Sequence, residues 1–187
     1  SIYKKLRIIA PEDVEVLAMK GFKNLKNTEF SKAKTYFNEY KKQSPKYSQI
    51  VKDIDMLDKS LKGSIYFLSK NQTEKSLKFL QKCQKIMQKY SISEDSILSK
   101  KIRKIDIDVY ILTQKYEEAV KEINKLISKT NNDDYDEFLF IKRGNILYIH
   151  KDYSGCISDF EKAIEITKDE NIKQKLQIYL NNAKKLQ

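Results

Sequence analysis

The feature that most constrains the fold of this chain is a set of residues that recurs at nearly constant spacing. Large apolar or aromatic residues and a proline recur 34 residues apart, as Tyr3, Leu6 and Pro11 and then as Phe37, Tyr40 and Pro45. Small residues recur at steps of 43, 43 and 37 residues, at Ala33, Ser76, Ala119 and Cys156. Periods of 20 to 50 residues are typical of arrays of similar units that bury their apolar faces against one another. The pattern therefore predicts a series of paired helices.

Composition favours helices as the repeated element. The 187 residues include only four Gly and two Pro, which leaves few places for hairpin turns or a glycine-rich phosphate loop. Charged residues make up 34% of the chain and the apolar set 40%, enough for a core and too polar for a membrane span. We therefore expect an all-α fold and no membrane partner.

Apolar residues three or four positions apart place the expected helices. The pattern predicts helices over 12–25, 31–42, 46–69, 73–89, 93–112, 116–129, 134–150, 153–167 and 171–186. Ser31, Ser93 and Asp134 are candidate N-terminal caps, because their side chains can accept a hydrogen bond from a free amide. The residues inserted beyond a 34-residue period are expected to lengthen helices and not loops.

No motif points to catalysis, a cofactor or a metal. Cys83 and Cys156 stand at small-residue packing positions and are expected to be buried and inert, and His150 is expected in a turn. The paired carboxylates Asp106 and Asp108 fit an exposed helix face. We therefore predict a protein that is not an enzyme, with no catalytic residue, no metal and no cofactor.

The net charge of +11 lies entirely in the first half of the chain. Residues 1–90 hold 20 basic and 9 acidic residues, whereas residues 91–187 hold 17 of each. Such an imbalance is compatible with an acidic or nucleic-acid partner, or with a solvated lysine-rich surface. Arginine, the usual base-reading residue, occurs only three times, which favours the solvated surface. RNA binding, with Tyr3, Tyr36, Tyr40 and Tyr47 as stacking platforms, is the disfavoured alternative.

The unit between Pro11 and Pro45 resembles the tetratricopeptide repeat (TPR) family. Leu17, Gly21 and Ala33 combine with the recurring aromatic residues in a nearly complete repeat of 34 residues. The resemblance implies a right-handed TPR superhelix, an α-α solenoid that forms one array over residues 1–187. Its expected parts are a partial repeat 1–13, repeats at about 14–47, 48–99, 100–136 and 137–170, and a capping helix 171–187. Ile107 stands where the first small residue of the third repeat is expected, which predicts wider helix packing there.

In TPR arrays the first helix of each repeat lines a concave groove that binds peptides. The residues that this resemblance places in the groove are apolar: Met19, Phe22, Leu25, Leu61, Ile65, Leu68, Ile105, Ile111, Phe138, Ile141 and Tyr148. Any one of them is either a ligand contact or part of the core between helices. Some TPR arrays grip a C-terminal carboxylate with lysine and asparagine, and the matching positions here hold Lys62 and Lys101 without the remaining residues. The resemblance therefore implies binding of apolar client segments.

Residues 46–187 are similar to the last TPR units of DnaJ-type co-chaperones, above all those of the ER-lumenal, interferon-induced-kinase inhibitor type. The similarity lies in the order of the segments LDKSLKGSIYFLSKNQTEKSLKFLQKC, KYEEAVKEINKLIS and LFIKRGNILYIHKDYSGCISDFEKAIEI. It implies that the repeats hold unfolded or partly folded client proteins. It also implies a J domain after Gln187 that acts on a DnaK-type chaperone, and a location in the endoplasmic reticulum lumen, with the cytoplasm as the alternative. A generic assembly scaffold for a folded partner is the main rival.

Overall fold

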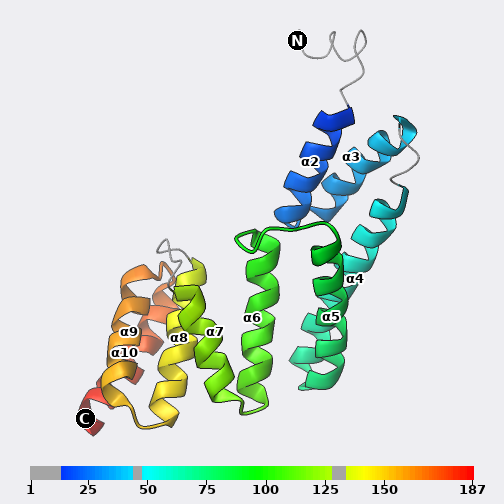
Figure 1. The fold of residues 1–187 in the computed structure, drawn as a ribbon. Coiled ribbons are helices and arrows are strands. Elements are labelled where there is room, and N and C mark those ends of the chain that lie inside the picture. The colour runs from blue at the N-terminus through cyan, green and yellow to red at the C-terminus, as the bar shows by residue number, and fades with distance from the viewer. Residues whose placement is uncertain (1–13, 44–47, 128–133) are drawn as a thin grey trace, which may run out of the picture. The chain divides into compact units, whose positions relative to one another are not determined.

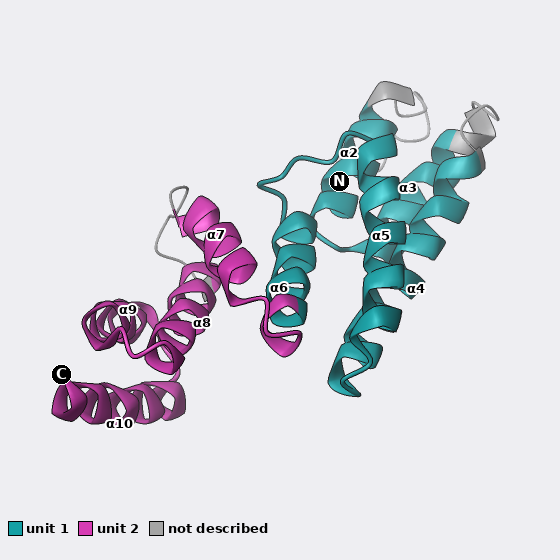
Figure 2. Cartoon of the chain, turned by 60° about the horizontal axis from the view of Figure 1, so that its bottom comes forward, with its two compact units in different colours: residues 1–109 teal, residues 110–187 magenta. Residues whose placement is uncertain are grey.

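A computed structural model describes residues 14–43, 48–127 and 134–187, and every regular element in these ranges is an α-helix (Figure 1). In chain order the helices are α2 (Val14–Lys26), α3 (Phe30–Gln43), α4 (Ser48–Ser69), α5 (Thr73–Lys89), α6 (Ile97–Leu112), α7 (Tyr116–Ile127), α8 (Asp134–Ile149), α9 (Tyr153–Ile166) and α10 (Glu170–Leu186). The expected all-α class is confirmed. The chain forms two compact units, residues 1–109 and 110–187 (Figure 2). No helix among the described residues has both the length and the apolar character needed to cross a membrane.

Two of the expected helix starts are wrong. Helix α3 begins at Phe30, so Ser31 lies inside its first turn, where its carbonyl accepts a hydrogen bond from the Thr35 hydroxyl. Helix α6 begins at Ile97 and not near Ser93. The Ser96 hydroxyl accepts a hydrogen bond from the Ser99 amide at 3.1 Å and acts as the cap of α6. The third candidate, Asp134, is the first residue of α8, and its side chain lies outside the described part of the chain.

Four turns of identical length repeat along the chain. Each joins two helices through three residues, and the middle one has a left-handed backbone: Thr28 (φ 62°), Asn71 (φ 55°), Gln114 (φ 57°) and Lys151 (φ 62°). These positions are 43, 43 and 37 residues apart, the same steps that separate the small residues. In every turn the amide after the left-handed residue donates to a carbonyl five residues earlier, which satisfies the end of the preceding helix. The sequence period therefore corresponds to a repeated backbone geometry.

The inserted residues lengthen one helix, α4, and also one connection between helices, residues 90–96. Helix α4 has 22 residues and α2 has 13 within the described range, so the second repeat is extended in its first helix, as expected. The segment between α5 and α6, residues 90–96, is longer than the three-residue turns. Ser93 and Ser96 occupy this connection because their side chains and carbonyls close a turn with Ser99 instead of continuing a helix.

In the first unit, α2 packs on α3, α3 on α4, and α4 on α5. Gly21 of α2 lies directly against the buried ring of Phe37 of α3, because a Cβ at Gly21 would lie 2.6 Å from that ring. At the equivalent place in α4 and α5, the hydroxyls of Ser64 and Ser76 are 2.8 Å apart and both residues are buried. Small residues thus allow close approach within both pairs, and one continuous apolar core runs from Leu17 to residue 109.

In the second unit, α7 packs on α8, α8 on α9, and α9 on α10. Gly144 faces the buried ring of Phe160, which repeats the contact of Gly21 in the first unit. Helix α10 covers the apolar face of α9 with three buried residues, Leu176, Leu180 and Ala183. The two helices of the expected third repeat, α6 and α7, belong mainly to different units.

Candidate functional site

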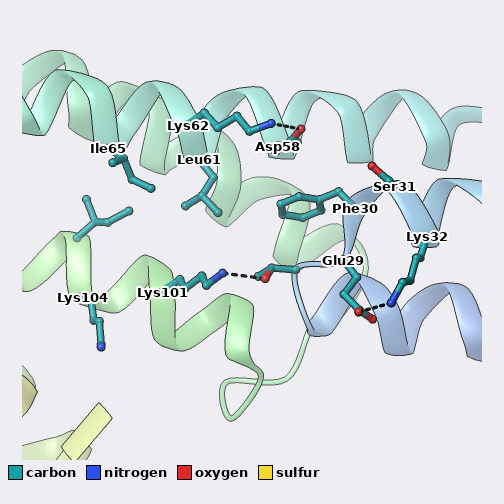
Figure 3. A pocket seen from close by; sticks show the side chains of 12 residues that line it. Glu29, Phe30, Ser31, Lys32, Asp58, Leu61, Lys62, Ile65, Lys101 and Lys104 are labelled. Atoms are coloured by element: carbon teal, nitrogen blue, oxygen red, sulfur yellow. Dashed lines mark hydrogen bonds and ion pairs between the residues drawn. The ribbon is translucent and has the colours of Figure 1, made fainter. Parts of the chain in front are cut away.

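A hollow in the first unit lies between α4, α6 and the turn that precedes α3 (Figure 3). We term it the α4/α6 groove. Its volume is about 890 Å³. Its lining residues are Thr28, Glu29, Phe30, Ser31, Lys32, Asp58, Leu61, Lys62, Ile65, Lys101, Lys104 and Ile105.

The floor of the groove is apolar. Leu61 and Ile65 are one helical turn apart on α4, so both side chains face the space toward α6, as Figure 3 shows. Leu61 and Ile105 are each 6% exposed and belong to the core of the unit, whereas Ile65 is 51% exposed. Phe30, at the start of α3, closes one end of the floor (Figure 3). The groove therefore presents a half-exposed isoleucine between fixed, buried neighbours.

The rim of the groove is basic. It carries four lysines and two carboxylates, which gives an excess of positive charge. The Lys62 ammonium lies 2.8 Å from Asp58. The Lys101 ammonium donates to the hydroxyl of Thr28 at 2.9 Å.

A third rim contact joins Lys32 to Glu29 at 2.6 Å. The hydrogen bond to the Glu29 carboxylate, together with its charge, raises the pKa of the Lys32 ammonium. Because this ion pair is exposed to solvent, it contributes little to stability and can be exchanged for a partner's carboxylate.

Five of the eleven residues expected in a groove line hollows of the first unit. Leu61, Ile65 and Ile105 come together in the α4/α6 groove. Met19, 71% exposed, and Phe22 line a second hollow of about 600 Å³ beside Tyr90. The remaining six lie elsewhere.

Leu25 is 1% exposed, so its side chain belongs to the core and has no surface to offer a ligand. Leu68 is half-buried against the same core. Ile111, Phe138, Ile141 and Tyr148 are half-buried residues of the second unit. Ile141 and Tyr148 pack there against the core formed by α9 and α10.

Sequence reasoning missed residues 28–32, which come from the turn before α3 and the first residues of α3, and it missed Lys104. A repeat pattern assigns groove positions from the first helix of each repeat. It cannot indicate that a turn within the preceding repeat closes one end of the groove. Lys62 and Lys101 were considered only as parts of a carboxylate clamp. In the structure they lie on the rim, where each already has an internal hydrogen-bond partner.

The two cysteines named in the sequence analysis are buried, and His150 is exposed in the turn between α8 and α9, as expected. Cys83 and Cys156 are both fully buried, and burial raises the pKa of their thiols to about 12 and about 11. His150 lies edge-on to the ring of Tyr116, with ring centroids 5.4 Å apart. Across residues 14–43, 48–127 and 134–187, no three His, Cys, Asp or Glu side chains form a group that could hold a metal ion.

Comparisons of the chain with known protein families, with curated proteins and with solved structures find no match.

Proposed function

We propose that this protein is a non-enzymatic protein-binding scaffold of the TPR kind, and that its α4/α6 groove takes apolar segments of unfolded or partly folded proteins. The observation that carries the proposal is the open hollow in which Ile65 is half exposed between Leu61 and Ile105. An extended segment that places an apolar side chain there would bury Ile65. Full burial of such a side chain contributes about 1.5 to 3 kcal/mol.

The size and chemistry of the groove support a peptide ligand. Its volume of about 890 Å³ falls in the range of ligand sites and exceeds what a single side chain needs. An apolar floor with polar groups at its edge provides affinity without demanding one sequence. This combination fits clients that share exposed apolar residues and little else.

The repeated turns support the solenoid part of the proposal. Four equivalent turns recur at the steps that separate the small residues of the repeats, and two glycine-ring contacts recur at equivalent repeat positions. The final helix buries Leu176, Leu180 and Ala183 against α9, and most of its exposed residues are polar, as the end of an array needs.

The narrower proposal is that the chain is the client-binding part of a DnaJ-type co-chaperone. It rests on the order and lengths of the segments in residues 46–187. In this proposal a J domain outside the sequence acts on a DnaK-type chaperone, and the endoplasmic reticulum lumen is the compartment.

Binding to a permanently unfolded protein tests the groove. Reduced, carboxymethylated lysozyme is titrated against the chain, with native lysozyme as the folded comparison. We expect Ile65→Glu to weaken binding to the unfolded form about tenfold, because a carboxylate replaces apolar contact in the groove. Far-UV circular dichroism checks that helicity is unchanged.

Met56→Glu is the matched control. Met56 lies on the same helix, is 49% exposed against 51% for Ile65, and does not line the groove. It should leave affinity within about twofold, as expected for surface substitutions. Equal loss in both variants contradicts the groove, and tighter binding to native lysozyme favours the rival scaffold for folded partners.

A further inference from the structure

Helix α5 carries a continuous row of lysines, and none of them lines the α4/α6 groove. Lys75, Lys78, Lys82, Lys85 and Lys89 follow one another at steps of three and four residues, and all five are exposed. At 3.6 residues per turn this spacing keeps them within one narrow face, and at 1.5 Å per residue the row is about 21 Å long. Glu74, in the first turn, is the single acidic residue of the helix.

The row is not neutralised within the described part of the chain. Only Lys89 has a carboxylate partner there, the buried Asp53. Lys75 and Lys82 lie over the rings of Phe67 and Phe79, at 5.3 and 5.1 Å from the ring centroids. Lys78 and Lys85 form no ion pair among the described residues.

Such a row destabilises the helix that carries it. Like charges three or four residues apart repel each other along a helix, and lysines in the first turn oppose the helix dipole. The equivalent helix α7 carries Glu117, Glu118 and Glu122 beside its two lysines, and in α9 Lys162 pairs with Glu165. The row of α5 is therefore less balanced by acidic residues than the surfaces of α7 and α9, and an anionic partner would relieve its repulsion.

We propose that this lysine row docks an acidic helical segment of a partner protein, with carboxylates three and four residues apart. The lysines follow one another every 5.3 Å or so along the axis, and a second helix with the same spacing presents its carboxylates at the same interval. An extended chain presents side chains on one side about every 6.7 Å and falls out of register along the row. The charge is complementary, and the partner's helix would lie along α5.

A protein helix fits the row better than a nucleic acid does. Duplex recognition uses a broad basic face that contacts two strands, together with arginines that read bases or grip phosphates bidentately. The row is one residue wide and contains no arginine. Its surface lies outside the α4/α6 groove, so the inference does not depend on the proposed function.

Three probes test the partner. The full chain is titrated by fluorescence anisotropy with a 21-residue alanine-rich peptide that carries glutamates at steps of three and four residues. The second probe has the same composition with the glutamate spacing scrambled, and the third is a single-stranded oligonucleotide of equal charge. We expect the registered peptide to bind most tightly and its affinity to fall as salt is added.

The variant Lys78→Gln/Lys85→Gln removes the two lysines of the row that form no ion pair with another described residue, and it should weaken registered-peptide binding about five- to tenfold. The control Lys52→Gln/Lys59→Gln removes the same charge from exposed positions of α4 and should change affinity by less than about twofold. Equal loss in the two variants, equal binding of the scrambled peptide, or tighter binding of the oligonucleotide would each overturn the proposal. Helicity of both variants is checked by circular dichroism.

Discussion

At the scale of single residues, the contact of a glycine with a ring determines how closely two helices pack. A Cβ at Gly21 would lie 2.6 Å from the ring of Phe37, which is 1% exposed and has no room to move. A Cβ at Gly63 would lie 3.0 Å from the ring of Phe79, which is partly exposed and can shift. The two glycines therefore respond differently to the same change.

We expect Gly21→Ala to destabilise the protein by about 1 to 3 kcal/mol through overpacking. Gly63→Ala should be neutral or stabilising, because alanine favours a helix by about 1 kcal/mol over glycine and Phe79 yields. Urea denaturation followed by circular dichroism measures both. Changes of the same sign and size would show that close packing at Gly21 does not limit stability.

The two thiols provide a second residue-scale prediction. Because Cys83 and Cys156 are buried and the pKa of each is raised, little thiolate forms in the folded protein at pH 8. A disulfide reagent such as Ellman's should react with both only at the rate at which the protein opens, and the rate should rise steeply with urea. Ser154→Cys, at an exposed position of α9, should add one thiol that reacts at once. Fast reaction of the unchanged protein would contradict the buried placement.

At the scale of elements, a buried carboxylate ties α4 to the end of α5. Asp53 accepts hydrogen bonds from the Lys89 ammonium, from the Tyr90 hydroxyl at 2.6 Å and from the Gln49 amide at 2.9 Å. Burial alone would raise the pKa of the Asp53 carboxyl. The three hydrogen bonds and the charge of Lys89 outweigh burial and hold this pKa below its ordinary value.

A lowered pKa in the folded state means that ionised Asp53 stabilises the protein above the unfolded-state pKa of about 3.9. This contribution should be lost as pH falls from about 4 through the lower folded-state pKa. Asp53→Asn should destabilise the protein by about 1 to 2 kcal/mol at pH 7 and flatten the loss of stability in acid. Urea titrations at pH 7, 5, 4 and 3 measure both effects.

Asp55→Asn is the control in the same helix. Asp55 forms an ion pair with Lys34, and the Asp55 side chain is nearly half exposed. Removing the charge of Asp55 should therefore change the free energy of unfolding by less than about 1 kcal/mol. If the free energy of unfolding falls equally in acid for the wild type and for Asp53→Asn, the acid-sensitive group lies elsewhere.

At the scale of the whole molecule, the chain divides into two units, each with a core. The first core is centred on α2 to α6, and the second includes the cluster between α9 and α10. Local opening free energies commonly follow such units. A destabilising change in one unit should therefore be detected mainly in that unit.

Hydrogen exchange measured by mass spectrometry tests this division. Gly144→Leu forces atoms against the ring of Phe160 and should speed exchange in residues 134–187 more than in residues 14–109. Gly21→Leu should have the opposite distribution. Exchange that rises throughout the chain in both variants would indicate a single cooperative unit.

The sequence by itself determined the helices and their repeat. Periodic apolar residues located α5 at the residues observed, and the steps of 43, 43 and 37 residues between the small residues equal the steps between the helix-to-helix turns. Both signals are local, since they depend on side-chain periodicity and on small residues within one helix pair. The predicted start of α6 at residue 93 is wrong because Ser93, Ser96 and Ser99 form hydrogen bonds with one another, and the sequence alone does not indicate which serine caps the helix.

Only the tertiary structure decided which apolar side chains are available to a ligand. Leu25 and Met19 belong to the same helix and to the same expected groove, yet one is 1% and the other 71% exposed. The difference depends on what neighbouring helices cover, and those helices come from distant parts of the chain. The α4/α6 groove likewise forms only where residues 28–32, four residues of α4 and three of α6 come together, and periodicity within one helix does not encode that arrangement.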